Sequence, residues 1–238
     1  MKSLILAGGL GERLRPLTHV IPKPLLPIGE KSILEIIMEG LKSSGCDEIV
    51  IATNYKSDLF EKYLSSTFSK LGIKVTISKE EEPLGTAGPI KLVRHLFKEP
   101  FIVINGDILT SLDFRKIVET HKRTNAKLTV GTKEINTPLQ YGMIESKDGS
   151  IIDNVIEKPN LTHEINAGIY VMNPELIDMI PEGKYNMTDL IKEMLQRGIR
   201  VAKHKIEEYW LDIGHMDAYQ KAQKDINNSE FYSNETKE

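Results

Sequence analysis

Three glycines in four positions, Gly8, Gly9 and Gly11, stand directly after a short apolar run near the start of the chain. Glycine lets backbone amides approach an anion closely, because no side chain blocks the path, so this loop is suited to phosphate. Arg13 adds a fork of donors that matches phosphate oxygens. The loop is not a Walker A loop, and Leu14 stands where the dinucleotide fingerprint would have a third glycine or alanine. A tight strand-to-helix turn without a ligand is the alternative.

A lysine held between two prolines follows a short distance downstream, in the run Pro22-Lys23-Pro24. Proline fixes its own φ and restricts the residue before it to extended conformations, so the backbone on both sides of Lys23 is stiff. A rigidly positioned ammonium just after a phosphate loop predicts a positive charge directed at phosphate. A surface lysine in a proline turn is the alternative that the residues alone leave open.

Two aspartates stand where carboxylates could hold a cation. Asp107 follows the wholly apolar run 101–104, and Asp212 lies in the run Trp210–Gly214. Mg²⁺ takes oxygen ligands and commonly uses one or two carboxylates together with substrate phosphates, so the pair is a candidate Mg²⁺ site. Each aspartate could instead cap the helix that follows it.

The hydrophobic pattern predicts a scaffold that brings these residues together. Short apolar runs alternate with runs of helical spacing, which predicts a doubly wound α/β fold with a mostly parallel sheet. Ligands of such folds bind at the carboxyl ends of the strands, where residues 7–15 and 105–107 would meet. The expected strands are 4–6, 49–52, 73–77, 101–104 and 128–132, and the expected helices are 33–41, 57–64, 90–97 and 114–118.

The rhythm changes after Thr137-Pro138. Residues 142–156, with Asp148-Gly149 in the middle, predict a β-hairpin inserted into the fold. The elements expected after it are a strand at 166–172, helices at 174–180 and 187–197, a strand at 201–206 and a helix from near His215. No linker separates independent domains, so we expect one domain over residues 1–226, with a mixed β insertion in its second half, and a frayed polar tail at 227–238.

The composition excludes several classes of protein. The chain has 238 residues and a formal net charge of −3, which gives no electrostatic argument for nucleic acid or a membrane surface as its main partner. Cys46 is the single cysteine, so an internal disulfide and a multi-cysteine metal site are excluded, and a reducing cytoplasm is the natural compartment. No apolar stretch has the length of a transmembrane helix. No Ser-His-Asp arrangement for nucleophilic catalysis is evident.

The motifs together resemble one family. The run Gly8–Thr18 followed by Pro22-Lys23-Pro24 is similar to the signature of the sugar nucleotidyltransferases, also called nucleoside-diphosphate-sugar pyrophosphorylases. The resemblance covers about residues 1–225 and continues in order through six further segments: 82–88, 105–107, 141–142, 157–159, 166–170 and 210–214. Many members continue into a left-handed β-helix, whereas this chain ends after a helix near 219–226. It therefore resembles the short guanylyltransferases of mannose, heptose or amino-sugar phosphates, and also the short uridylyltransferases.

The resemblance implies a Rossmann-like, glycosyltransferase-A-like sheet with a β-rich sugar-binding insertion. It also implies that the domain has a nucleotide-binding half to about residue 137 and a sugar-phosphate half over about residues 138–226. It also implies that a sugar 1-phosphate attacks the α-phosphorus of an NTP, with Mg²⁺ present, to give an NDP-sugar and pyrophosphate. The implied catalytic residues are Arg13, Lys23, Asp107 and Lys158, and the implied metal ligands are Asp107 and Asp212. The implied nucleotide-binding residues are Leu6, Ala7, Gly8, Gly9, Gly11, Arg13, Lys23, Glu82, Pro83, Gly85, Thr86 and Gly106. The implied sugar-phosphate residues are Asn105, Tyr141, Gly142, Glu157, Lys158, Asn166 and Gly168.

The identity of the base is left open between GTP, which we favour, and UTP, dTTP or CTP. Guanine presents adjacent N1–H and N2–H donors, which the carboxylate of Glu81 or Glu82 could accept together. A catalytically silent nucleotide-sugar sensor is a competing function, although every implied catalytic residue is present. A glycosyltransferase is disfavoured, because the run Asp107-Ile108-Leu109 lacks an Asp-x-Asp metal motif. The oligomeric state is open, and a homodimer is compatible with the sequence.

Overall fold

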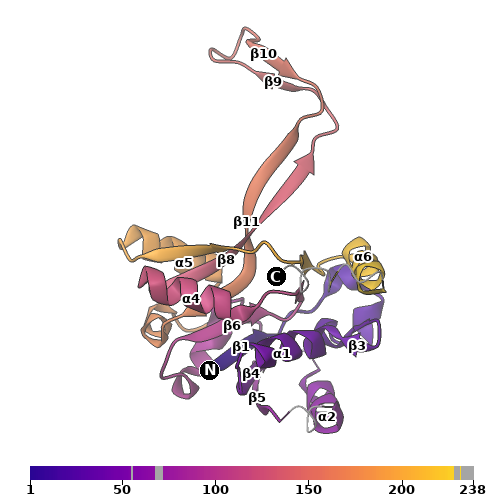
Figure 1. Ribbon diagram of the computed structural model, residues 1–238, viewed down its shortest axis with the longest axis vertical. Coiled ribbons are helices and arrows are strands. Elements are labelled where there is room, and N and C mark those ends of the chain that lie inside the picture. Colours follow the sequence, from indigo (N-terminus) through magenta and orange to yellow (C-terminus); the bar gives the residue numbers. More distant parts are fainter. Residues whose placement is uncertain (55, 68–71, 228–230, 232–238) are drawn as a thin grey trace.

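The computed structural model describes residues 1–54, 56–67, 72–227 and 231. Its centre is a seven-stranded sheet in the order β12-β8-β11-β6-β1-β4-β5 (Figure 1). The strands are β1 (Lys2–Leu6), β4 (Glu48–Thr53), β5 (Lys74–Lys79), β6 (Phe101–Asn105), β8 (Leu128–Pro138), β11 (Asn160–Met172) and β12 (Val201–Lys205). Strands β6, β1, β4 and β5 are parallel, β12 is parallel to β8, and β11 is antiparallel to both β6 and β8. The predicted doubly wound, mostly parallel mixed sheet is confirmed.

Helices cover both faces of the sheet. They are α1 (Ile33–Ser43), α2 (Ser57–Thr67), α3 (Gly88–Leu92), α4 (Phe114–Thr124), α5 (Met187–Gln196) and α6 (Met216–Asn227). The single helix expected at 90–97 is instead α3, which has a proline in its first turn, followed by a separate 3₁₀ turn at Arg94–Leu96. The helix expected at 174–180 is a 3₁₀ helix, Pro174–Met179. Ser32 begins α1 with a capping box, in which its side chain accepts from Glu35 N and the Glu35 carboxylate accepts from Ser32 N.

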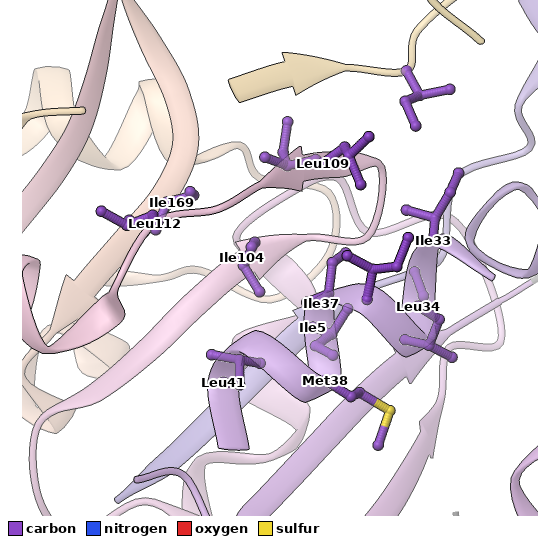
Figure 2. Close-up of a cluster of buried hydrophobic side chains, with 14 of the residues drawn as sticks. Ile5, Ile33, Leu34, Ile37, Met38, Leu41, Ile104, Leu109, Leu112 and Ile169 are labelled. Atoms are coloured by element: carbon purple, nitrogen blue, oxygen red, sulfur yellow. The ribbon is translucent and has the colours of Figure 1, made fainter. Parts of the chain in front are cut away.

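Two hydrophobic clusters lie on opposite faces of the sheet, because neighbouring strand residues point to opposite sides. In β1, Ile5 joins the cluster beneath α1 and α4, whereas Leu4 joins the cluster beneath α3 and α5. Figure 2 shows the first cluster, in which Ile37 and Leu41 of α1 lie over the strand residues Ile5 and Ile104. The apolar stripe that the sequence predicts on α1 is therefore the face that packs against the sheet.

Strands β8 and β11 run past the edge of the sheet as a two-stranded ribbon, and the short hairpin of β9 (Met143–Glu145) and β10 (Asn154–Ile156) lies at its far end (Figure 1). We call residues 133–165 the arm. The predicted hairpin is confirmed, and Gly149 in its turn has a φ of 80°. The ribbon itself was not expected, since the strands were predicted to cover only 128–132 and 166–172. Both faces of the ribbon meet solvent, so residues 133–138 and 160–165 carry no buried apolar alternation that would mark a strand.

Two small sheets were also not predicted. Strand β2 (Pro27–Ile28) pairs with β3 (Lys31–Ser32), and β7 (Ile108–Thr110) pairs with β13 (Trp210–Asp212). These strands are two or three residues long, too short for a periodic pattern.

The predicted polar tail falls mostly on residues 228–230 and 232–238, which lie outside the described residues. Helix α6 ends at Asn227, and Phe231, which we expected to be frayed, is buried with its ring edge-on to Tyr209. Among the described residues, no helix is long and apolar enough to cross a membrane.

Candidate functional site

A cavity of about 270 Å³ opens at the carboxyl ends of β1 and β6, where a doubly wound fold binds its ligands. It is lined by Leu6, Ala7, Gly8, Gly9, Lys23, Pro24, Glu80, Pro83, Leu84, Gly85, Thr86, Pro89, Asn105, Gly106, Asp107 and Lys184. The glycine loop and the turn after β6 thus meet in one place, as their positions after strands predicted, and the Pro-Lys-Pro turn joins them there. Of the residues expected to bind nucleotide, Gly11, Arg13 and Glu82 are absent from this lining.

The glycine loop leaves space for a neighbouring carboxylate. A Cβ added at Gly8 would collide with Oε1 of Glu80. Glu80 is buried, its backbone amide donates to Thr53 O, and its Oε2 accepts from Leu84 N at 3.2 Å. Burial raises the pKa of the Glu80 carboxyl, because the charged form loses water, and the hydrogen bond from Leu84 offsets this only in part. A buried carboxylate with spare acceptor capacity therefore lies in the wall of the cavity.

The two glutamates expected to face the base, Glu81 and Glu82, do not line this cavity, whereas Glu80 of the same run does. Glu81 and Glu82 are exposed and line a separate cavity of about 720 Å³. A usable signal was present: Glu80 is the first residue after β5, at the end of the strand where ligands of this fold bind.

The loop that follows Glu80 is held by a segment about one hundred residues further along the chain. The amides of Ala87 and Gly88 both donate to Tyr185 O, at 2.9 and 3.1 Å, and Met187 N donates to the Thr86 hydroxyl at 2.9 Å. The same segment brings Lys184 into the cavity lining. Nothing local in the sequence marks Lys184, because its position depends on a long-range contact.

Lys23 and Asp107 form an ion pair in the cavity, with Lys23 Nζ 2.5 Å from Asp107 Oδ2. The side chain of Lys23 is 10% exposed and that of Asp107 is 29% exposed. The other carboxylate oxygen, Asp107 Oδ1, is buried and has no hydrogen-bond partner among the described residues. An anionic oxygen in this position is available to a cation.

The second aspartate arrives through the β7–β13 pair, in which Asp212 lies opposite Ile108 and Ile213 N donates to Asp107 O. Desolvation and the nearby Asp107 carboxylate raise the pKa of Asp212, while Lys23 and Arg13 act in the opposite direction. The guanidinium of Arg13 lies beside Asp212, since both come within 3.4 Å of a Cβ added at Gly214. Arg13 therefore belongs to the carboxylate side of the site.

The donor set fits a hard divalent cation that retains water and phosphate ligands. Asp107 and Asp212 supply two carboxylates, and no group of three or more His, Cys, Asp or Glu within the described ranges could hold a metal ion. Mg²⁺ is commonly bound by one or two carboxylates plus substrate phosphates, whereas a structural zinc site needs four protein ligands.

Three of the residues expected to bind sugar phosphate lie where the arm leaves the sheet: Asn105, Asn166 and Gly168. A Cβ at Gly168, whose φ is 70°, would lie 2.6 Å from Asn105 Nδ2, so only glycine permits this approach. The amide of Gly168 donates to Asn166 Oδ1 at 3.0 Å. Asn105 Oδ1 is buried without a hydrogen-bond partner in the described part of the chain. The base of the arm thus adjoins the cavity and carries a free acceptor.

The other four, Tyr141, Gly142, Glu157 and Lys158, lie at the outer end of the ribbon (Figure 1). None of them lines the cavity. The β8–β11 ladder separates them from the base of the arm by six residues, which is about 20 Å at roughly 3.3 Å per residue. The structure therefore does not bring these residues to the nucleotide cavity of the same chain.

A family model described as nucleotidyl transferase matches residues 2–229. Among curated relatives, a mannose-1-phosphate guanyltransferase of Yarrowia lipolytica is 40% identical over 223 residues, and that of Saccharomyces cerevisiae is 36% identical over 224 residues. In both cases the match covers 90% of this chain and 61% of the relative, so the chain spans about three fifths of the length of these proteins.

The solved structures similar to this chain include HddC from Yersinia pseudotuberculosis, with 30% identity, a TM-score of 0.75, and coverage of 94% of this chain and 99% of that one. HddC in complex with GMP-PN matches with 29% identity and a TM-score of 0.74, covering 94% of this chain and 99% of that one. A putative glucose-1-phosphate thymidylyltransferase from Bacillus anthracis has 26% identity and a TM-score of 0.76, with coverage of 94% of both chains.

Proposed function

The chain belongs to the nucleotidyl transferase family, and from that premise we propose that it transfers guanylate from GTP to a mannose-like hexose or heptose 1-phosphate, releasing pyrophosphate. The names of the curated relatives and the complex of HddC with GMP-PN support a guanine nucleotide. The observation within this chain that carries the proposal is the buried Glu80 carboxylate in the wall of the cavity.

Glu80 suits guanine because of the donors that guanine presents. The carboxylate accepts one hydrogen bond, from Leu84 N, and Oε1 faces the glycine loop. Guanine N1–H and N2–H are adjacent donors and could both be accepted by one carboxylate, which would replace part of the hydration that burial removes. Uracil and thymine offer one ring N–H between two carbonyl oxygens, and those oxygens would be repelled by the carboxylate. We therefore assign base recognition to Glu80 in place of Glu81 or Glu82.

The phosphates are assigned to the part of the cavity that the glycine loop and Lys23 line. Backbone amides of Gly8 and Gly9 are open to the cavity, and Lys23 supplies a positive charge there. Lys23 pairs with Asp107, so it lies between the glycine loop and the carboxylates. The sugar phosphate would attack the α-phosphorus of GTP there, and pyrophosphate would leave. Arg13 adds a second cation beside Asp212. These groups position the phosphates and balance the charge that develops on them.

The family uses a divalent metal, and we propose Mg²⁺ held by Asp107 and Asp212. When bound, it would supply positive charge for the oxygens of the transferred phosphoryl group. The unpartnered Asp107 Oδ1 supports this assignment. Before a cation binds, the ion pair between Lys23 and Asp107 Oδ2 compensates the negative charge of this carboxylate.

No protein nucleophile is needed, because the attacking sugar phosphate is already an anion. Cys46 is buried, and burial raises the pKa of its thiol to about 11, so it is not a nucleophile at neutral pH. Catalysis then consists of bringing two polyanions together in line. Asn105 and Gly168 form the near edge of the sugar-phosphate site, and Glu157 and Lys158 are assigned to the sugar and its phosphate.

The proposal is tested by measuring pyrophosphate release with GTP, UTP, dTTP, CTP and ATP against a panel of sugar 1-phosphates in the presence of Mg²⁺. We expect release with GTP and a mannose-like hexose or heptose 1-phosphate. Absence of release with every combination would exclude the enzymatic function and leave nucleotide sensing.

A further inference from the structure

Lys158 has two features of a residue at a functional site, although it lies far from the cavity. Its φ of 44° is rare for a residue other than glycine, and the following proline restricts it further. Such backbone conformations persist where the surroundings require them, often at binding sites. Neither Lys158 nor Glu157 makes a side-chain hydrogen bond or an ion pair with any residue that the structure describes.

The arm is held away from the cavity of its own chain. The β8–β11 pairing is uninterrupted from Thr132 with Asn166 to Pro138 with Asn160, and the irregularity in the ladder lies between Asn166 and Tyr170, inside the body. With no bulge outside the body to turn the ribbon, Lys158 stands at its outer end, about 20 Å beyond the base of the arm at roughly 3.3 Å per residue. The sugar-phosphate side of the site is therefore incomplete within one chain.

The tip of the arm, residues 139–159, exposes apolar side chains that a free ribbon would not tolerate well. Tyr141, Ile144, Ile151, Ile152 and Val155 are all more than half exposed. Ile144 and Val155 lie directly opposite each other in the β9–β10 pair and form one apolar face. An isolated two-stranded hairpin is marginally stable in water, so burial of this face against another surface would stabilise it.

A matching surface lies beside the cavity. Residues 10–21, which lead from the glycine loop to Lys23, expose Leu10, Leu17, Val20 and Ile21. Nine of the eleven exposed large hydrophobic residues in the described part of the chain lie in these two segments, which singles them out as a pair of contact surfaces. The charges are also complementary, since the tip carries four acidic and two basic side chains and residues 10–21 carry one acidic and two basic ones, counting Asp, Glu, Lys and Arg.

We propose that the arm of one copy of this chain docks on residues 10–21 of a second copy and supplies Lys158 and Glu157 to the sugar-phosphate side of that copy's site. The arrangement is reciprocal, as expected for a two-fold dimer, so both apolar tips are covered and both sites are completed. The assignment of Lys158 and Glu157 rests on the proposed function, whereas the docking of the arm rests on the exposed surfaces alone.

Docking is tested without any activity measurement. A chain carrying Ile152→Cys is mixed with a tagged chain carrying Val20→Cys and treated with a short bismaleimide. Cys46 is 2% exposed and gives little background. We expect a mixed product at about twice the 26.9 kDa chain mass, and little of it when Leu195→Cys, an exposed position outside both surfaces, replaces Val20→Cys. A monomer in sedimentation at all concentrations, or equal cross-linking to both positions, would overturn the proposal.

Completion of the site in trans is tested by co-expressing chains with Lys158→Ala and Asp107→Asn and assaying at a limiting concentration of sugar 1-phosphate, where each variant alone is strongly impaired. A mixed dimer has one site with an intact cavity and an intact arm, so we expect about one quarter of wild-type activity per chain at random assembly. No recovery, with mixed dimers present and wild type active, means that Lys158 acts within its own chain. If wild type itself releases no pyrophosphate, the proposed function fails, and cross-linking still decides the docking.

Discussion

Replacing Glu80 by glutamine tests how the base is recognised. The side chain keeps its shape and one carbonyl oxygen, so it can still accept from Leu84 N. It loses its charge and one acceptor, and its amide N–H₂ would face a guanine donor. We therefore expect Glu80→Gln to lose selectivity for GTP while the fold remains intact.

The magnitude follows from the number of hydrogen bonds lost. A hydrogen bond to a charged group contributes about 1.5–3 kcal/mol, and one of the two proposed bonds to guanine is removed. At about 1.4 kcal/mol per factor of ten, the ratio of kcat/KM for GTP to that for UTP should fall roughly 10- to 100-fold. Inosine triphosphate, which lacks the 2-amino donor, should be a poorer substrate than GTP for wild type and nearly equal to it for the variant.

Matched controls separate recognition from stability. Glu81→Gln and Glu82→Gln change exposed carboxylates outside the cavity and should alter the GTP-to-UTP ratio less than about twofold. Burial raises the folded-state pKa of Glu80, so its charge opposes folding at pH above that pKa, and this opposition fades as the pH falls through it. Glu80→Gln should thus unfold at the same or a higher temperature at pH 8. An unchanged ratio in a folded variant would refute the assignment of guanine recognition to Glu80.

Three further predictions follow from the same geometry. Asp107→Asn should fold normally and lower kcat on the order of 100-fold, and wild-type turnover across a Mg²⁺ titration would show that Asp107 is not a ligand. Lys158→Ala should raise KM for the sugar 1-phosphate more than KM for GTP, and Arg13→Ala should raise KM for GTP more. Each substitution removes charge-assisted hydrogen bonding that contributes about 1.5–3 kcal/mol to binding of the affected substrate. Equal effects on both substrates would mean that the two phosphate sites are wrongly divided. Burial lowers the folded-state pKa of His121, whose ring bonds Thr129 and Asn173, so the stability it contributes is present above about pH 6.5 and is lost as the pH falls below that value; thermal unfolding from pH 8 to 5 should show a steeper acid decline in wild type than in His121→Gln.

The part of the fold that positions the nucleotide cavity was visible in the sequence because it is buried. Composition predicts strands such as β6, which is apolar on both faces. Hydrophobic periodicity predicts helices such as α1, which has one apolar stripe. The glycine loop, Lys23 and Asp107 then met in one cavity because each lies just after a strand or in a loop at the same edge of the sheet.

The parts that the sequence did not reveal depend on long-range pairing or on solvent exposure. The ribbon of the arm has no buried face, so residues 133–138 carry no strand pattern. The β7–β13 pair that brings Asp212 beside Asp107 is three residues long. Lys184 reaches the cavity only because Tyr185 holds the loop at Ala87. In each case the determining contact is far away in the chain, where local patterns carry no information.

The most direct test of guanylyl transfer is to compare kcat/KM for GTP and UTP with mannose 1-phosphate held at a fixed concentration, identifying the product by mass. We predict GDP-mannose and pyrophosphate in equal amounts, with GTP preferred at least tenfold, the lower limit set by one charge-assisted bond to guanine. A preference for UTP would contradict the role of the Glu80 carboxylate, and consumption of GTP without formation of GDP-mannose would contradict the proposed reaction with this acceptor.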